Sequence, residues 1–213
     1  MQKILVMGGS SGIGLATVNA ALDAGFSVRM FSRHADTSPL THPLLEKVAG
    51  DALSSAAVTE ALEGVDAVVQ SLGVPFNLRL FTGPIDLFSA ATKVLLPAMQ
   101  QHGVTRLLAV TGFGAGTSQA AIHPLQRAGF NLVFGRAYAD KTRQEEMIVN
   151  SALDWTIVRP GVLTNGPARP NYKALADPET WRNGVTSRAS VADFIVKSLN
   201  DPQWRHAAPV LVN

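Results

Sequence analysis

A glycine-rich stretch near the start of the 213-residue chain, GGSSGIG at residues 8–14, fits two different chemistries. Its first five residues match G-x-S-x-G, the sharp turn on which many hydrolases carry a nucleophilic serine, here Ser10. Its glycines Gly8, Gly12 and Gly14 match the spacing of a loop that binds the pyrophosphate of a dinucleotide. The elements around the stretch must decide between the two.

The hydrolase interpretation lacks elements that it needs. Hydrolases of this kind take their oxyanion donors from an earlier strand and loop, whereas only nine residues precede Ser10, enough for one strand. All five histidines, the candidates for a general base, fall in stretches that we expect to be loops or helix ends. Ser10 is therefore a weak candidate for a nucleophile.

The dinucleotide interpretation has the required context. We expect an apolar strand at residues 4–7, a helix with one apolar face at 15–22 and a second strand at 28–31. In such a loop the first glycine permits a tight turn, the second admits the pyrophosphate and the third lets the helix pack closely. An ordinary glycine turn is the alternative. The predicted phosphate-binding residues, which use the amides at the helix start, are Gly8, Gly9, Ser10, Ser11, Gly12, Ile13 and Gly14.

The end of the second strand predicts which dinucleotide is bound. NAD enzymes carry a carboxylate there for the ribose hydroxyls, but this chain continues Phe31-Ser32-Arg33-His34. Arginine can form charge-assisted hydrogen bonds to a 2′-phosphate, and no acidic residue stands beside it. Ser32 and Arg33 therefore favour NADP(H), with a merely solvated Arg33 as the alternative.

Strand and helix patterns alternate along the whole chain. Further strands are expected at 48–49, 67–69, 107–110, 155–158 and 209–212, and further helices at 56–62, 88–101, 139–151 and 191–199. This order predicts an α/β fold: a Rossmann-type, doubly wound parallel sheet with helices on both faces and a small C-terminal substrate-side region. We expect one domain over residues 1–213, with 112–137 and 160–190 as substrate-side loops because they break the alternation.

Composition excludes several other classes of function. The net charge of +2 comes without a long basic run, so nucleic acid is not expected as a partner. The absence of cysteine excludes disulfides, thiolate metal sites and thiol nucleophiles, and no metal site is expected. The N-terminus has no signal-peptide core and no stretch suits a membrane span, so we expect a cytoplasmic monomer or homodimer that acts on a small molecule.

The chain resembles the short-chain dehydrogenase/reductase superfamily. GGSSGIG has its G-x-x-x-G-x-G spacing, Gly50-Asp51-Ala52 resembles its step beside the adenine, and Ser71-Leu72-Gly73 resembles the strand end along the cofactor. SALDWTIVRPG at residues 151–161 and SRASVADF at 187–194 are similar to the atypical branch of NAD(P)H-binding, NmrA-like and flavin/biliverdin reductase-like proteins. The resemblance implies further NADP(H) contacts at Asp51, Ala52, Ser71, Leu72, Gly73, Thr111, Lys141, Pro160, Gly161 and Val162.

The usual catalytic pair of that superfamily is incomplete. Its members place a tyrosine acid four residues before a ribose-binding lysine, but here Tyr138 stands three before Lys141, roughly 100° around the helix, and Ala137 takes the fourth place. The catalytic candidates are Lys141, Tyr138 and Thr111, whose hydroxyl follows the fifth strand. The alternatives are a surface Lys141 paired with Glu145 and a Thr111 that bonds its own backbone.

Two functions fit these residues. The first is an NADPH-dependent oxidoreductase that transfers hydride to a flat, conjugated, flavin- or quinone-like molecule, since such acceptors need no positioned tyrosine. The second is a non-catalytic NADP(H)-binding redox sensor of NmrA-like type. Several aromatic side chains would form a flat substrate wall or, equally well, fill the core: Phe113, Phe130, Phe134, Tyr172 and Trp181.

Overall fold

The computed structural model describes residues 2–74, 85–122 and 124–213, and the side chains of 124–133 lie outside the description. Its main feature is an eight-stranded sheet with the order β3-β2-β1-β4-β5-β6-β10-β8. All neighbouring strands are parallel except β10 and β8, which are antiparallel. The bounds are β1 Lys3–Met7, β2 Ser27–Ser32, β3 Leu45–Ala49, β4 Ala67–Gln70, β5 Arg106–Val110, β6 Asp154–Pro160, β8 Lys173–Leu175 and β10 Val210–Val212.

The strand order reverses direction between β1 and β4. From β1 the chain moves outward through β2 and β3, then returns to the other side of β1 and continues through β4, β5 and β6. In parallel sheets of this kind, the crevice for a ligand opens at the carboxyl ends of the two strands where the order reverses. The glycine-rich stretch follows β1, so the fold places it at that crevice.

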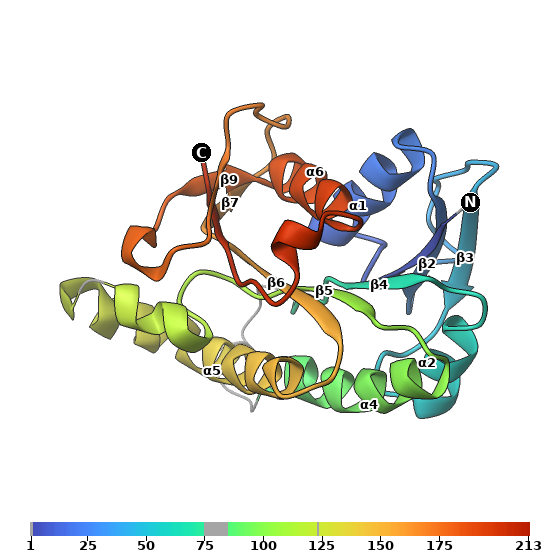
Figure 1. The fold of residues 1–213 in the computed structure, drawn as a ribbon, viewed down its shortest axis with the longest axis horizontal. Helices are drawn as coiled ribbons and strands as arrows, with labels where there is room; N and C mark the ends of the chain where they lie inside the picture. The colour runs from blue at the N-terminus through green and yellow to red at the C-terminus, as the bar shows by residue number, and fades with distance from the viewer. Residues whose placement is uncertain (1, 75–84, 123) are drawn as a thin grey trace.

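Helices cover both faces of the sheet (Figure 1). Helices α1 (Gly12–Asp23) and α6 (Arg188–Ser198) pack side by side on one face. Helices α2 (Ser55–Ala61), α4 (Leu87–Gln101) and α5 (Pro124–Val149) lie on the other. The predicted fold class, a Rossmann-type sheet with helices on both faces, is confirmed.

Side chains of the central strands alternate between two cores. On β1, Ile4 and Val6 pack into the cluster with α1 and α6, whereas Leu5 and Met7 pack into the cluster with α2, α4 and α5. Because both faces are covered, the central strands contain short, nearly continuous apolar runs instead of a strict alternation of apolar and polar residues. This explains why short apolar runs sufficed to predict these strands.

The two expected loops contain more regular structure than the sequence predicts. In 112–137 the chain forms a 3-10 helix, η1 (Gly116–Ala121), and α5 begins at Pro124 instead of 139. Glycines at 129 and 135 weaken the helical pattern, while proline is well suited to a first helical position. In 160–190 the chain forms β7 (Val162–Thr164), β8, η2 (Pro178–Thr180) and β9 (Val185–Ser187), with η3 (Pro202–Trp204) following α6.

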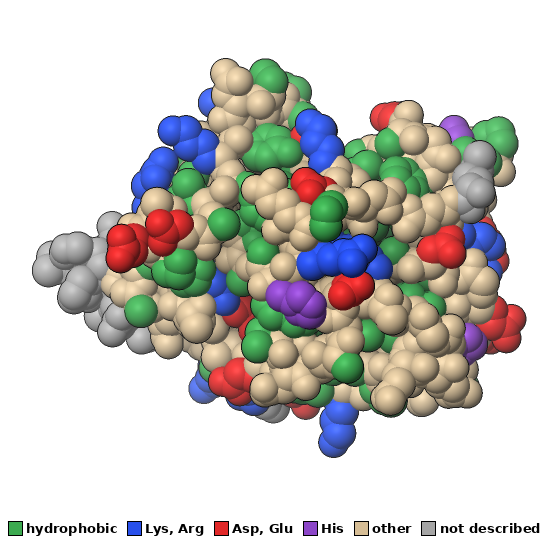
Figure 2. Space-filling model, in the orientation of Figure 1, with side chains coloured by type: hydrophobic (Ala, Val, Ile, Leu, Met, Phe, Trp, Pro, Cys, Tyr) green, Lys and Arg blue, Asp and Glu red, His purple; other side chains and the backbone are tan. Residues whose placement is uncertain are grey.

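The distribution of surface charge and the character of the helices are relevant to nucleic-acid and membrane partners. On the face shown in Figure 2, basic and acidic side chains are interspersed, so the small net charge is dispersed over it. Among the described residues, no helix combines the length and the apolar character that crossing a bilayer requires.

Candidate active site

The glycine-rich loop lies in close contact with the neighbouring strand and helix. Gly8 has a φ of +83°, and a Cβ on it would overlap the carbonyl oxygen of Ser71 at the end of β4. A Cβ on Gly14 would overlap the carbonyl oxygen of Gly8, and one on Gly9 would lie 2.8 Å from the Met30 side chain. The loop can therefore fold this tightly only because these positions lack side chains.

In front of Gly12 the loop is open. Gly12 has a φ of +57°, and no described atom lies within 4 Å of the place where its Cβ would be. Ser11, the residue before α1, makes no side-chain capping bond to the helix, while Ile13 is buried beneath the loop. The first backbone N–H groups of a helix have no helical carbonyl to bond, and they attract anions. The loop therefore fits the pyrophosphate of a dinucleotide.

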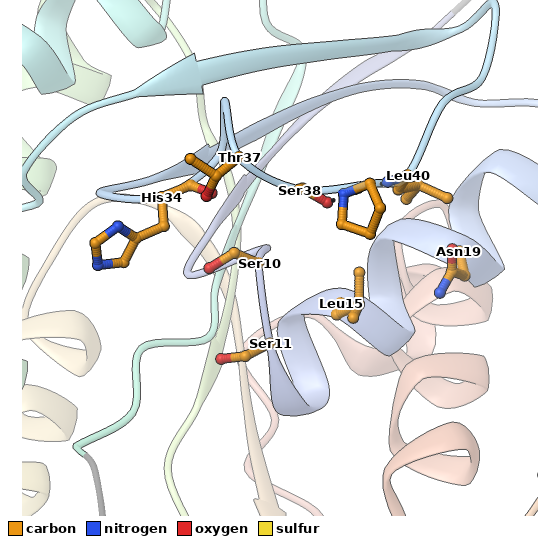
Figure 3. A pocket seen from close by; sticks show the side chains of 9 residues that line it. Ser10, Ser11, Leu15, Asn19, His34, Thr37, Ser38 and Leu40 are labelled. Atoms are coloured by element: carbon orange, nitrogen blue, oxygen red, sulfur yellow. Dashed lines mark hydrogen bonds between the residues drawn. The ribbon is translucent and has the colours of Figure 1, made fainter.

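A pocket of about 660 Å³ lies between α1 and the segment after β2. In Figure 3 the side chains of Ser10, His34 and Thr37 gather at one end, and Leu15, Asn19 and Leu40 lie toward the other. Ser11, Ser38 and Pro39 complete the lining. Hydroxyl and imidazole groups of this kind suit an anionic ligand.

The end of β2 adds two of the predicted cofactor residues to this region. Arg33 is exposed beside the pocket-lining His34. The hydroxyl oxygen of Ser32 is buried and has no hydrogen-bond partner within the described part of the chain. An unpartnered buried hydroxyl costs free energy unless a ligand or water completes it. The region therefore fits the ribose end of a dinucleotide.

The residues predicted to lie along the adenine and the cofactor follow β3 and β4. Asp51 is exposed, its Oδ1 accepts a hydrogen bond of 3.0 Å from the backbone N–H of Leu53, and Ala52 is buried. The N–H of Ser71 donates to the Met7 carbonyl at 2.9 Å, which joins β4 to β1, and the half-buried Leu72 packs against the core. Gly73 is exposed. These predicted contacts thus follow the carboxyl ends of β3 and β4, two strands that lie on opposite sides of β1 in the sheet.

Lys141 points inward to the end of β5. Its Nζ donates a hydrogen bond of 2.6 Å to the Thr111 carbonyl, 5.0 Å from the Phe88 ring centroid and 5.3 Å from that of Tyr138. Burial lowers the pKa of the Lys141 ammonium to about 8, and the negative charge of Glu145 acts in the opposite direction. The alternative of a surface lysine paired with Glu145 is wrong, because Glu145 is paired with Arg159.

Ala137 and Tyr138 occupy different environments. Ala137, one turn before Lys141, is 6% exposed and packs against Phe88, so no phenol stands there. Tyr138 nevertheless reaches the end of β5, because a Cβ on Gly112 would lie 2.6 Å from its hydroxyl oxygen. Burial raises the pKa of the Tyr138 phenol, which keeps it protonated.

A buried network links Thr111 to the next strand. Its hydroxyl donates to Oε1 of Glu145 at 2.6 Å, so the alternative in which Thr111 bonds its own backbone is wrong. Arg159 donates to both carboxylate oxygens of Glu145, at 3.1 Å from Nε and 2.6 Å from Nη2. The guanidinium also donates to the Thr117 hydroxyl at 3.1 Å and lies 4.9 Å from the centroid of Trp181.

Sequence reasoning missed the Glu145–Arg159 pair, although a signal was present. Arg159 follows the apolar run at 155–158 in a strand expected to be buried. A charged residue in such a strand requires an oppositely charged partner. The carboxylates of the preceding helix, Glu145 among them, were candidates for that partner.

The residues at the end of β6 that were predicted to contact the cofactor pack closely against a neighbouring segment. The Pro160 carbonyl accepts a hydrogen bond of 2.9 Å from Phe113, and the N–H of Gly161 donates to Leu211 at 3.1 Å. A Cβ on Gly161 would overlap the carbonyl oxygen of Gly184, to which the N–H of Val162 donates at 2.7 Å. The Val162 side chain is 56% exposed. Gly161 is thus required for the close approach of the two segments.

Three of the aromatic residues considered for a substrate wall pack in or against the core. Phe113 and Trp181 belong to a cluster with β10. The Tyr172 hydroxyl donates to Asp193 at 2.8 Å, and its ring packs edge-on against α6. Phe134 packs edge-on against Tyr138, while the Phe130 side chain lies outside the described residues. The core alternative holds for Phe113, whereas Tyr172 and Trp181 are half-buried and pack at the edge of the core.

Comparison with known proteins gives consistent matches over the chain. The model of the NAD(P)H-binding family matches residues 8–202. An uncharacterised chloroplastic protein of Arabidopsis thaliana is 30% identical over 207 residues, covering 93% of this chain and 72% of that protein.

Two solved structures share the fold across the chain. A protein of Escherichia coli O157:H7 described as an anaerobillin reductase has a TM-score of 0.79 and 24% identity, covering 100% and 97% of the two chains. A short-chain dehydrogenase/reductase of Veillonella parvula, solved with NADP, has a TM-score of 0.80 and 15% identity, covering 100% and 94%. The chloroplastic relative leaves a cytoplasmic location as a prediction only.

Proposed function

Because the chain belongs to the NAD(P)H-binding family, we propose that it is an NADPH-dependent oxidoreductase that reduces a flat, conjugated, flavin- or quinone-like molecule. The observation that carries this proposal is the pairing of a fixed Lys141 ammonium, 2.6 Å from the Thr111 carbonyl, with a buried Ala137 one turn earlier. The site has a cation for the cofactor but no phenol at the usual place. A conjugated acceptor disperses the charge it receives and can take its proton from water.

The chain's residues would divide the work as follows. The amides at the start of α1 bind the pyrophosphate, Gly12 leaves the room for it, and Gly8 and Gly14 allow the tight turn that aims the amides. Lys141 and the end of β5 orient the nicotinamide ribose. A bound nicotinamide supplies the hydride itself. The protein's contribution is therefore alignment of donor and acceptor.

NADP(H) is the proposed form of the cofactor. Arg33, the Ser32 hydroxyl that lacks a partner among the described residues, and the hydroxyl-lined end of the pocket support a 2′-phosphate. The Veillonella structure contains NADP, and the Escherichia coli structure is described as a reductase. Both support the proposal by likeness of fold.

Turnover tests the proposal. Purified protein is mixed with NADPH and either FMN or menadione, and NADPH oxidation is followed by absorbance. Lys141→Ala is expected to lower kcat/KM at least about tenfold, whereas Lys93→Ala, an exposed lysine on the adjacent α4, leaves it unchanged. Wild-type oxidation no faster than that of Lys141→Ala would contradict the proposal.

The second candidate is a non-catalytic NADP(H)-binding redox sensor. The observation that favours it is Ala137, since an alanine at that position cannot donate a proton. Tight NADPH binding without oxidation across flavins, quinones and aldehydes would support the sensor.

A further inference from the structure

We propose that Glu145 is a positioning residue: held by Arg159, it keeps the Lys141 side chain charged and fixed at the end of β5. The inference rests on the proposed dinucleotide site, because it is the cation of that site whose charge and position Glu145 would control. Nothing in the motifs of the sequence assigns this role to Glu145.

The first support is a chain of contacts that ends on one residue. Glu145 and Lys141 lie four residues apart on α5, so they share a face of the helix. Glu145 accepts the hydroxyl hydrogen of Thr111, and Lys141 donates to the carbonyl of the same Thr111. Two side chains on one face of α5 are therefore both hydrogen-bonded to Thr111, the residue that follows β5.

The second support is that Glu145 is buried and held by contacts on several sides. Glu145 and Arg159 are each 3% exposed, and two hydrogen bonds join the guanidinium to the carboxylate. A Cβ on Gly116 would overlap Oε2 of Glu145, so the backbone of η1 covers the pair. Trp181 covers the guanidinium from the β8–β9 segment. The negative charge of Glu145 is thus held in place one helical turn after Lys141 on α5.

The third support is electrostatic. Among the described residues, the titratable groups that contact Lys141 or shift its pKa are Tyr138 and Glu145, both on α5. The uncharged Phe88 of α4 and Thr111 after β5 also contact its ammonium, and Arg159 of β6 is paired with Glu145. Burial lowers the pKa of Lys141 to about 8, and Glu145 is the charge that raises it. Without Glu145, less of the lysine would be charged near neutral pH.

Asp140 provides a matched control on the same helix. Its carboxylate is also fully buried, but it accepts hydrogen bonds from the backbone of Phe88 at 2.8 Å and from Arg143 at 3.0 Å. It therefore caps the start of α4, and its charge is not among those that shift the pKa of Lys141. Asp140→Asn removes a buried negative charge from α5 without removing the one proposed to act on Lys141.

The experiment measures the titration of Lys141 directly in the full chain. Lysine labelled with ¹³C at Cε is followed by NMR against pH, and the Lys141 signal is assigned by its loss in Lys141→Arg. The wild-type midpoint is expected near 8, Glu145→Gln is expected to titrate lower, and Asp140→Asn is expected to match the wild type. If Glu145→Gln titrates with the wild type, or Asp140→Asn shifts equally, the proposal is overturned.

NADPH binding gives a second readout. Because the proposed ligand contact needs the charged lysine, the Kd of wild type rises as pH increases through about 8. Glu145→Gln is expected to show this rise at lower pH, with a Kd roughly threefold above the wild-type value near pH 8 and similar to it near pH 6. A pH profile that coincides with the wild type would contradict the inference.

A double variant covers the case in which Glu145→Gln does not fold. Removing one member of a buried pair leaves an unpaired charge, whereas removing both is far better tolerated. Glu145→Gln with Arg159→Gln keeps two side chains that can bond each other, and the Lys141 midpoint is again expected to fall. If wild type fails to bind NADPH at any pH, the proposed function fails, while the lysine titration still decides the role of Glu145.

Discussion

The hydroxyl oxygen of Tyr138 lies 2.6 Å from the point where a Cβ on Gly112 would be. Gly112 thus makes room for a tyrosine that reaches the end of β5 from a direction that helical geometry alone would not favour. Gly112→Ala is expected to lower the free energy of unfolding by about 1–3 kcal/mol, because overpacking displaces the ring. Chemical denaturation measures the loss.

A double-mutant cycle tests that this cost comes from the tyrosine ring. In a Tyr138→Ala background the phenol is gone, and Gly112→Ala is expected to cost much less. An equal cost in both backgrounds would mean that the alanine strains the strand end itself.

The glycine loop predicts a selective loss of cofactor binding. Gly14→Ala places a methyl group against the carbonyl oxygen of Gly8, so the loop must open. The Kd for NADPH is expected to rise at least about tenfold, as one lost pyrophosphate contact would give. Gly166→Ala is the control, since no described atom lies within 4 Å of its Cβ position. Calorimetry that finds equal affinity in both variants would count against the loop as the phosphate site.

Cofactor choice is predicted to depend on Arg33. Arg33→Asp replaces a cation beside the pocket by a carboxylate, which repels a 2′-phosphate and can accept ribose hydroxyls. The ratio of NADPH to NADH affinity is expected to fall at least about tenfold. Arg182→Asp, at an exposed position after η2, should leave the ratio unchanged. Equal weakening of both cofactors by Arg33→Asp would refute the assignment.

Lys141 is predicted to reduce the stability of the fold. Its pKa is lowered from 10.5 to about 8, so below pH 8 the chain carries the full cost of burying an ammonium group. Lys141→Met is therefore expected to be more stable than wild type at neutral pH, by about 1–3 kcal/mol.

The pH dependence has a definite sign. Between pH 8 and 10.5 the unfolded chain binds more protons than the folded one, so wild-type stability from this group rises with pH. The advantage of Lys141→Met should shrink over that range, as urea titrations at several pH values would reveal. A variant that is less stable at neutral pH would mean that the hydrogen bond to Thr111 outweighs the cost of burial.

Local patterns in the sequence predicted the parts of the fold that local physics determines. The apolar strands, the glycine loop and the helices α2, α4 and α6 lie within three residues of their expected bounds. The start of α5 was missed by fifteen residues, because 124 lies in a segment whose glycines weaken the helical pattern.

Of the candidate site, too, only the parts that belong to local sequence patterns could be predicted. The glycine loop and Lys141 belong to local motifs. The bonds from Phe88 to Asp140 and from Thr111 to Glu145 join residues 52 and 34 positions apart, so only the packing of α5 brings these partners together. No spacing rule in the sequence predicts such contacts.

The burial of Ala137 against Phe88 also bears on how such a site can change. A phenol ring at position 137 would have to enter the cluster that Phe88 and Leu72 already fill. Gaining the familiar tyrosine acid would therefore take at least two coordinated substitutions, one to supply the ring and one to clear its place. The first of these alone would overpack the cluster, so the packing around Ala137 holds the site in its present form.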